Sequence, residues 1–274
     1  MPQFLKDGEV ISPKRKGSFY PDVIAVIPAY NAEKTIGNVV RKVLRKVGRC
    51  IVVDDGSSDG TGDTAVNAGA ELIVHVSNRG KGAAIRTALN FLRKMSYKYI
   101  IFLDADGQHQ PGEITRFVQA AQRRRAHFVC GNRMSKPEGM PLIRKITNRV
   151  MSKIVSKLCG VKLADTQCGY RLLSKKAAES LRLKKSNFEV DSEMLYQVAR
   201  KGFKVTEVTI SSIYASGDYS SNIRPVSDTF RFICLITGLF FSKSESKPSV
   251  KSRTPRNVKE NQKPRFRRSN RKNK

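Results

Sequence analysis

The sequence of 274 residues has no apolar run long enough to cross a membrane, which takes about 18 or more residues. Its longest candidate, FRFICLITGLFF at residues 230–241, would extend only about 18 Å as a helix. The hydrocarbon core of a bilayer is about 30 Å thick. We therefore expect this segment to lie on a bilayer or dip into it, not to span it.

The sequence also lacks paired cysteines, because its five cysteines are odd in number and form no CxxC motif. Most of them lie inside or beside apolar runs, which is typical of buried free thiols in a reducing compartment. Residues 1–22 mix charged and polar residues and show no secretory signal. Together these patterns predict a cytoplasmic protein without a disulfide framework.

Acidic residues are scarce, since 23 Asp and Glu stand against 52 Lys and Arg and leave a formal net charge of +29. This charge favours anionic partners: nucleic acid, an anionic membrane face or phosphorylated substrates. Residues 243–274 alone hold 13 basic and 2 acidic residues, a net charge of +11, without any apolar period. This tail is predicted to be disordered. Nucleic-acid binding by the tail is a minor alternative, because Phe266 is its one aromatic platform.

Five short apolar runs, rich in β-branched residues, predict buried strands. Residues 36–47 and 83–95 instead repeat apolar residues with the period of a helix. Strands that alternate with helices predict an α/β domain with a mostly parallel sheet. The predicted strands are residues 23–28, 50–55, 71–76, 99–106 and 127–131. Residues 188–210 are expected to form a helix followed by a final strand.

Acidic and polar side chains follow three of these strands at the point where each strand ends. Ligands of a parallel sheet bind beyond the carboxyl ends of its strands, so the three ends are expected to form one shared ligand site. The residues concerned are Tyr30, Asn31, Glu33, Asp54, Asp55, Asp104 and Asp106.

Asp104 and Asp106 form the most informative pair, because alternate residues of a strand point to the same side. Two such carboxylates repel each other unless a cation lies between them, and their hard oxygens suit Mg²⁺ or Mn²⁺. Mg²⁺ usually completes its shell with water and substrate phosphates, which indicates a metal–diphosphate complex. Acid–base catalysis on a glycosidic bond is the alternative. It needs carboxylates about 5–9.5 Å apart across the bond, so neighbours at i and i+2 fit a metal better.

The chain carries an ordered set of motifs, VIPAYNAEKTI, VVDDGSSDGT, NRGKGAAIRTAL, DADGQHQP and DTQCGYRLL. In this order they resemble the motifs of the family 2 glycosyltransferases, which have the Rossmann-like GT-A fold that binds nucleotide sugars. Within that family, the resemblance is closest to dolichyl- and polyprenyl-phosphate mannose and glucose synthases. It extends from Val23 to Arg224 and implies a catalytic domain over residues 23–216.

On the donor side, the resemblance implies a site for a GDP- or UDP-sugar. Asp54 would hydrogen-bond the base, and Lys81 would lie close to the phosphates. The nucleoside pocket would be lined by Pro28, Ala29, Tyr30 and Glu33.

The resemblance also implies a metal site in DADGQHQP. Asp106 would bind Mg²⁺ or Mn²⁺ directly, with Gln108 as an additional ligand, and Asp104 would face the sugar or a metal-bound water. His109 invites a ligand role beside the metal, but packing within the loop near Pro111 is the favoured interpretation.

On the acceptor side, the resemblance implies arginines that bind a phosphate, because a guanidinium can grip two phosphate oxygens at once. The candidates are Arg133, Arg144 and Arg224, with Arg149 competing with Arg144. The residues expected to approach the transferred sugar are Asp165, Gln167 and Arg171.

Asp191 or Glu193 would occupy the region of the general base in the family. A lipid phosphate is already anionic near neutral pH, since the second pKa of such a group is about 6, so it needs less deprotonation than a hydroxyl does. Asp191 would then orient groups without acting as a base, or it would serve as the N-cap of the helix SEMLYQVARKG. The sequence leaves these roles open.

Residues 217–242 combine an apolar helical stripe with polar positions, and the polybasic tail follows at once. An amphipathic element and a basic patch together can attach a protein reversibly to anionic lipid. We expect residues 223–241 and the tail to attach the protein in this way. The predicted order is an N-terminal extension at 1–22, the catalytic domain, this interface segment at 217–242 and the tail at 243–274. The protein is expected to be peripheral at the cytoplasmic membrane face.

These observations predict metal-dependent, inverting transfer of a hexose from GDP-mannose or UDP-glucose to a polyprenyl phosphate. The alternative is a family 2 glycosyltransferase that acts on a hydroxyl of a glycan, glycolipid or protein and needs Asp191 as a base.

Overall fold

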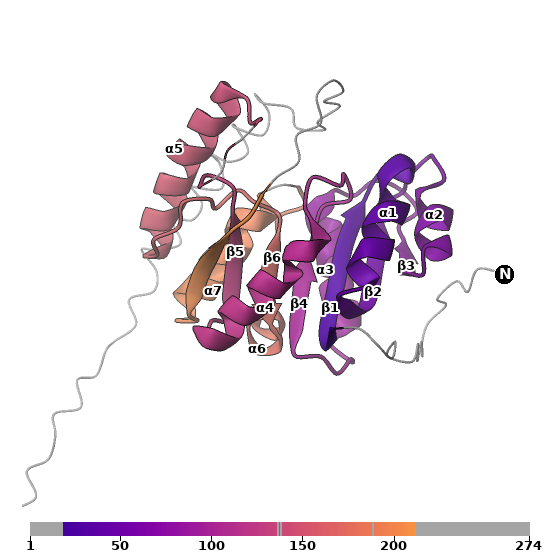
Figure 1. Ribbon diagram of the computed structural model, residues 1–274, viewed down its shortest axis with the longest axis horizontal. Coiled ribbons are helices and arrows are strands. Elements are labelled where there is room, and N and C mark those ends of the chain that lie inside the picture. Colours follow the sequence, from indigo (N-terminus) through magenta and orange to yellow (C-terminus); the bar gives the residue numbers. More distant parts are fainter. Residues whose placement is uncertain (1–18, 136, 138, 188, 212–274) are drawn as a thin grey trace, which may run out of the picture. The chain divides into compact units, whose positions relative to one another are not determined.

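One sheet of seven strands, with helices on both faces, makes up the part of the chain that the structure describes (Figure 1). This computed structural model describes residues 19–135, 137, 139–187 and 189–211. The strands are β1 (Tyr20–Ala29), β2 (Val47–Asp54), β3 (Glu71–Val74), β4 (Tyr99–Phe102), β5 (Phe128–Asn132), β6 (Arg171–Ser174) and β7 (Val205–Thr209). The helices are α1 (Glu33–Leu44), α2 (Thr61–Asn67), α3 (Lys81–Leu92), α4 (Ile114–Arg123), α5 (Leu142–Cys159), α6 (Lys175–Ser180) and α7 (Val190–Arg200), with a short 3₁₀ turn at Pro111–Glu113.

The strands run in the order β3-β2-β1-β4-β6-β5-β7. Every pairing is parallel except those of β6, which is antiparallel to both β4 and β5. The predicted α/β fold with a mostly parallel sheet is therefore confirmed. All five predicted strands are present, and β1 begins earlier than the predicted Val23, at Tyr20.

Alternation along β1 distributes its side chains between two apolar layers. Val23, Ala25 and Ile27 contribute to the layer that α1 and α4 cover, whereas Ile24 and Val26 contribute to the layer of α3 and α7. Both faces of the strand are buried, which explains its near-continuous apolar sequence.

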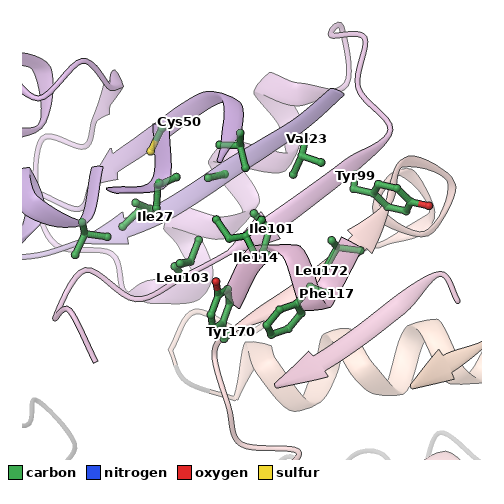
Figure 2. Packing of buried hydrophobic residues seen from close by; sticks show 14 of the residues in the cluster. Val23, Ile27, Cys50, Tyr99, Ile101, Leu103, Ile114, Phe117, Tyr170 and Leu172 are labelled. Atoms are coloured by element: carbon green, nitrogen blue, oxygen red, sulfur yellow. The ribbon is translucent and has the colours of Figure 1, made fainter. Parts of the chain in front are cut away.

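The layer beneath α1 and α4 reaches across the sheet to the segment before β6 (Figure 2). Phe117 of α4 packs against Tyr170, with ring centroids 4.3 Å apart. In α1, the apolar residues recur every three or four positions, and each fully buried Val or Ile contributes about 1.5–3 kcal/mol to folding. The buried apolar side chains of α1 are those of Ile36, Val39, Val40, Val43 and Leu44.

The parallel strands β1, β2 and β4 end at one edge of the sheet, so the polar segments that follow them lie at that edge. Helix α5 packs against α7 and contributes Val155 to the apolar layer of α3 and α7. In the described ranges, no helix is both long enough and apolar enough to cross a bilayer. The predicted interface segment 217–242, the tail 243–274 and Arg224 lie outside the described residues.

Candidate active site

The ends of β1 and β2 meet in register, with Ala29 opposite Asp54. The Asp54 side chain is buried, and its Oδ1 accepts bonds from the backbone N–H and the hydroxyl of Ser57, at 2.9 and 2.5 Å. Pro28 is half-buried next to Ala29, while Tyr30 is 40% exposed. The structure thus brings these predicted nucleoside residues to one rim and fixes Asp54 through its own turn.

The two loops of this rim are locked to each other. The Asn31 N–H donates to Ser57 Oγ at 2.9 Å, and the Ser58 N–H donates to Asn31 Oδ1 at 2.9 Å. Glu33 begins α1 with an exposed side chain, and its N–H donates to Asp59 Oδ2 at 3.2 Å. The Asp59 carboxylate therefore stabilises the N-terminus of α1 from the neighbouring loop.

Lys81, the first residue of α3, lies between two carboxylates. Its Nζ is 2.7 Å from Asp104 Oδ1 and 3.2 Å from Asp191 Oδ2. Burial opposes charge on this lysine, but the two carboxylates raise its pKa above the ordinary value. Burial likewise opposes ionisation of Asp104, and the Lys81 ammonium overcomes it and lowers the pKa of Asp104. In this structure Lys81 pairs with protein carboxylates, which the sequence did not predict.

Asp55 holds the loop that precedes Lys81 and so helps to position the ion pair. Asp55 is buried beneath the loop that precedes Lys81, where its carboxylate accepts from the backbone N–H groups of Arg79 and Gly80 at 3.0 and 2.7 Å. Its Oδ1 also lies 2.6 Å from His75 Nδ1. The expectation that Asp55 faces the ligand rim is therefore wrong, because the loop and the histidine surround its carboxylate.

Gly169 leaves the space that Asp104 and Lys81 occupy. A Cβ atom at this position would lie 2.6 Å from Asp104 Oδ2 and 2.8 Å from Lys81 Nζ, closer than van der Waals contact permits. The glycine of DTQCGYRLL is thus required by close approach.

Asp104 and Asp106 both follow the end of β4 at Phe102 and lie in the turn beyond it. Asp106 is exposed, and its Oδ1 accepts from the Gln108 N–H at 2.9 Å. Partial desolvation and then the charge of Asp104 raise the pKa of Asp106. Crowded negative charge of this kind favours a cation at the turn.

His109 faces the core beneath the same turn. Its Nδ1 accepts the backbone N–H of Asp104 at 3.2 Å, and its ring stacks on Tyr170 with centroids 5.0 Å apart. The ring is buried, and burial lowers its pKa. The packing interpretation of His109 is therefore confirmed.

Arg133 and Asp165 form a buried pair on the acceptor side. Arg133 Nε and Nη2 donate to the two oxygens of Asp165 at 2.7 and 3.1 Å, and the Arg133 N–H donates to Oδ2 at 3.2 Å. Burial opposes ionisation of Asp165, but the guanidinium lowers its pKa. Asp165 is fully buried and holds Arg133 in this structure, and its predicted approach to the sugar stays a prediction.

Arg171 is fully buried at the start of β6. It donates to the carbonyl oxygens of Cys168 and Thr166 at 2.7 and 2.6 Å, and also to the carbonyl oxygen of Asp191. Its Nε lies 3.5 Å from Asp191 Oδ1. The Arg171 guanidinium thus ties the 166–171 segment to α7, and its predicted contact with the sugar stays a prediction.

Asp191 lies in the first turn of α7, where Glu189 is the N-cap. The N-cap interpretation of Asp191 is therefore wrong: its two oxygens face Lys81 and Arg171. Glu193 is no better placed as a base, because its carboxylate accepts from the backbone N–H groups of Lys184 and Lys185. Both acids therefore position neighbouring groups.

Gln167 lies half-buried between the acceptor segment and α7. Its Nε2 donates to Thr166 Oγ1 at 3.0 Å and to Ser192 Oγ at 3.4 Å. Arg144 is half-buried in the first turn of α5, and Arg149 is exposed one turn further on. Of the candidate acceptor residues, the structure thus brings Gln167, Arg133 and Arg171 together around one segment and places Arg144 on a separate helix.

Comparison with known proteins identifies the family of this chain. The family described as Glycosyl transferase family 2 matches residues 24–182, more than half of the sequence. The chain is a family 2 glycosyltransferase.

Relatives of this glycosyltransferase include two that are nearly one third identical to it over the aligned residues. A UDP-N-acetylglucosamine–dolichyl-phosphate N-acetylglucosaminyltransferase of Methanococcus voltae is 32% identical over 215 residues, which cover 70% of this chain and 86% of the relative. An undecaprenyl-phosphate mannosyltransferase of Micrococcus luteus is 31% identical over 206 residues, which cover 70% and 83%.

Among solved structures, mannosyl-3-phosphoglycerate synthase from Rubrobacter xylanophilus has the same fold, with a TM-score of 0.65 at 16% identity. The match covers 85% of this chain and 78% of that one. The GT-A fold of the glycosyltransferase is therefore confirmed by structure as well as by sequence.

The oxygen ligands in the turn after β4 fit a hard cation that also keeps water molecules and substrate oxygens as ligands. Among the described residues, no cluster of three or more His, Cys, Asp and Glu side chains is arranged to hold a metal. Mg²⁺, however, is commonly held by one or two carboxylates together with substrate phosphates. The exposed Asp106 and the Gln108 side chain beside it offer oxygen ligands of this type.

The residues that sequence reasoning missed act behind the site. His75 contacts Asp55, which holds the loop before Lys81, and Gly169 leaves space for Lys81 and Asp104. The Glu193 carboxylate holds the backbone of residues 184–185, which precede α7. A signal existed for Gly169, because an isolated glycine beside a strand often marks a place where another group approaches the backbone closely. The sequence contained no signal for His75, because a single histidine near the end of a strand can have many structural roles.

Proposed function

We propose that this family 2 glycosyltransferase transfers a hexose from a GDP- or UDP-sugar to a polyprenyl phosphate, with inversion at the anomeric carbon. The observation that carries the proposal is the environment of Asp191. Its two carboxylate oxygens lie 3.2 Å from Lys81 Nζ and 3.5 Å from Arg171 Nε.

Lys81 and Arg171 face the two oxygens of the Asp191 carboxylate, so neither oxygen is directed at an acceptor hydroxyl. A hydroxyl acceptor needs a base to remove its proton as it attacks, which contributes about 10²–10⁴-fold to such reactions. An acceptor phosphate is already ionised near neutral pH. The pairing of Asp191 therefore favours the phosphate, and Asp191 then acts by positioning Lys81.

The names of the two relatives support the same acceptor class, since one acts on dolichyl phosphate and the other on undecaprenyl phosphate. They differ in the sugar, and the donor of this chain is proposed only as far as a GDP- or UDP-hexose. GDP-mannose and UDP-glucose remain the first donors to test.

On the donor side, the nucleoside would lie against Tyr30, Glu33 and Asp54, which share the rim of β1 and β2. Asp106 and Gln108 would hold Mg²⁺ or Mn²⁺, which would neutralise charge on the donor diphosphate. A glucosyl-3-phosphoglycerate synthase of the same fold, from Mycobacterium tuberculosis, has been crystallised with Mn²⁺ and UDP. Lys81 adds a buried positive charge at this edge of the sheet.

On the acceptor side, an oxygen of the lipid phosphate attacks the anomeric carbon while the bond to the diphosphate breaks and the nucleoside diphosphate leaves. Arg133, Arg144 and Arg224 are proposed to attract and orient the acceptor phosphate. Arg133 would do so from its fixed pairing with Asp165, so its planar charge is held in one orientation.

An enzyme whose acceptor is a lipid acts at a membrane surface. We propose that the protein is peripheral and that residues 217–242 and the basic tail at 243–274 contribute to attachment.

The direct test incubates the purified protein with Mg²⁺ or Mn²⁺, a polyprenyl phosphate in detergent and radiolabelled GDP-mannose, UDP-glucose or UDP-N-acetylglucosamine. Label that enters the organic phase with one donor would establish the reaction and the sugar together. Slow release of nucleotide without labelled lipid would contradict the lipid acceptor and favour a hydroxyl acceptor.

A further inference from the structure

Helix α5 has an apolar outward face. At about 100° per residue, its exposed apolar side chains fall within an arc of about 120°. The buried residues of the helix lie on the other side. The exposed set is Leu142 at 69%, Ile143 at 81%, Ile146 at 53%, Val150 at 51% and Ile154 at 38% exposure. The buried set is Asn148, Ser152, Val155, Ser156 and Leu158.

The charges of α5 are all positive. Its sequence, LIRKITNRVMSKIVSKLC, contains five Lys and Arg and no Asp or Glu. By helical position, Lys145 and Arg149 flank the apolar stripe, and Lys153 and Lys157 fall within its C-terminal half. Long basic side chains in such positions can lay their stems on apolar surface and keep the charge at a polar boundary.

We propose that the apolar stripe of α5 docks on an anionic lipid surface. An apolar face bordered by basic residues matches both parts of that surface, the acyl chains and the anionic headgroups. A second copy of α5 would bring like charges together, and so would the basic tail at 243–274, which carries +11. Charge complementarity therefore selects lipid over either of these occupants.

The helix is tied to the acceptor side at both ends. Arg133 precedes α5 and Asp165 follows it, and the two residues are paired at 2.7 Å. Ser152 Oγ, on the buried face, accepts the N–H of Thr166 at 2.9 Å. A docked α5 would consequently hold the Arg133 side of the site at the level of the lipid headgroups. This consequence rests on the proposed function, whereas the docking itself does not.

The chain contains no tryptophan, so a single introduced one reports on one place. The experiment places tryptophan at Ile146 in the full chain and, as a matched control, at Val76, which is fully exposed after β3. Each protein is mixed with vesicles of phosphatidylcholine, with or without phosphatidylglycerol, and with the same vesicles carrying bromine-labelled acyl chains.

The proposal predicts that emission of Ile146→Trp moves to shorter wavelength with anionic vesicles and is quenched by brominated chains, while that of Val76→Trp is unchanged. Emission of Ile146→Trp that stays unchanged while the protein sediments with vesicles would overturn it. So would an equal response to neutral vesicles. Emission of Ile146→Trp at short wavelength before lipid is added would indicate that another part of the chain covers the stripe. Emission that changes with protein concentration would indicate that a second copy covers it. Either result would overturn the proposal.

Substitution provides an independent measure on the full chain. Ile143→Ser and Ile146→Ser should each weaken partition into anionic vesicles about tenfold, whereas Val74→Ser and Val76→Ser should leave it unchanged. Unchanged thermal unfolding would show that all four variants fold. Unchanged partition of both isoleucine variants would contradict docking by α5. If tryptophan enters the bilayer but no sugar reaches polyprenyl phosphate, the proposed acceptor is wrong and the docking stands.

Discussion

The donor and acceptor sides of this glycosyltransferase are built in different ways. On the donor side, Tyr30, Glu33 and Asp106 are exposed at the ends of parallel strands, where a ligand can reach them. On the acceptor side, Asp165 and Arg171 are fully buried and bind other protein groups. The donor side exposes side chains that a ligand can contact, whereas ion pairs and hydrogen bonds within the protein fix the conformation of the acceptor side.

This difference has a physical cause. The donor residues follow strands that the core already fixes, so short turns suffice to position them. The segment 164–171 instead returns to the sheet from α5 and brings the backbone carbonyls of Thr166 and Cys168 next to Arg171. Arg171 supplies the donors for these carbonyls, and Asp191 balances part of its charge.

Removal of the buried arginine should show this contrast most strongly. Arg171→Met removes the side-chain donor of three carbonyl oxygens and the cation beside Asp191 Oδ1, which should cost about 3–5 kcal/mol of unfolding free energy. Urea unfolding measures the cost. Arg123→Met, at an exposed position near the end of α4, should cost less than about 1 kcal/mol. An equally stable Arg171→Met protein that has lost transfer would instead indicate direct contact with substrate.

On the donor side, loss of one exposed carboxylate should affect rate and not stability. Asp106→Ala should lower metal-dependent transfer about 100- to 1000-fold, because it removes the proposed metal ligand. Donor hydrolysis should fall in parallel, and the urea midpoint should stay the same. Asp22→Ala, which removes an exposed carboxylate near the start of β1, at the other end of the strand, is the control. Intact metal-dependent transfer by Asp106→Ala would refute the assigned metal site.

Gly169 lies where the two sides meet, so a single methyl group there should disturb both. Gly169→Ala forces a Cβ to within 2.6 Å of Asp104 and should cost about 1–3 kcal/mol of stability. Displacement of the Lys81 pair should also slow transfer about tenfold. The matched control is Gly112→Ala, whose Cβ would meet no atom within 4 Å. Equal behaviour of the two variants in unfolding and transfer assays would contradict the role given to Gly169.

The sequence allowed the fold to be predicted in large part, together with the edge of the sheet where the candidate donor residues lie. Apolar runs located five strands, and the polar residues after three of them located the rim that contains Asp54 and Asp104. Strand β6 was missed, because RLLS is short and its arginine is untypical of a buried strand. Its antiparallel pairing with β4 and β5 depends on tertiary contacts that periodicity does not report.

For the acceptor side, the sequence suggested candidate residues but not the protein groups that they contact. Asp165 and Arg171 were read as substrate contacts, yet their partners lie far along the chain: Arg133 in one case and Asp191 in the other. No local pattern indicates which charged residues will neutralise each other in the fold. The roles of Arg144 and Arg224 toward the acceptor remain predictions.

The smallest effect is expected at Asp191, whose substitution distinguishes a phosphate acceptor from a hydroxyl acceptor. The measurement is kcat for transfer to polyprenyl phosphate by the parent protein and by Asp191→Asn, with thermal unfolding of both as a check on folding. If the acceptor phosphate is already ionised and Asp191 only positions Lys81, kcat should fall less than about tenfold. A loss of about 10²–10⁴-fold in a folded variant would make Asp191 the general base and contradict this account.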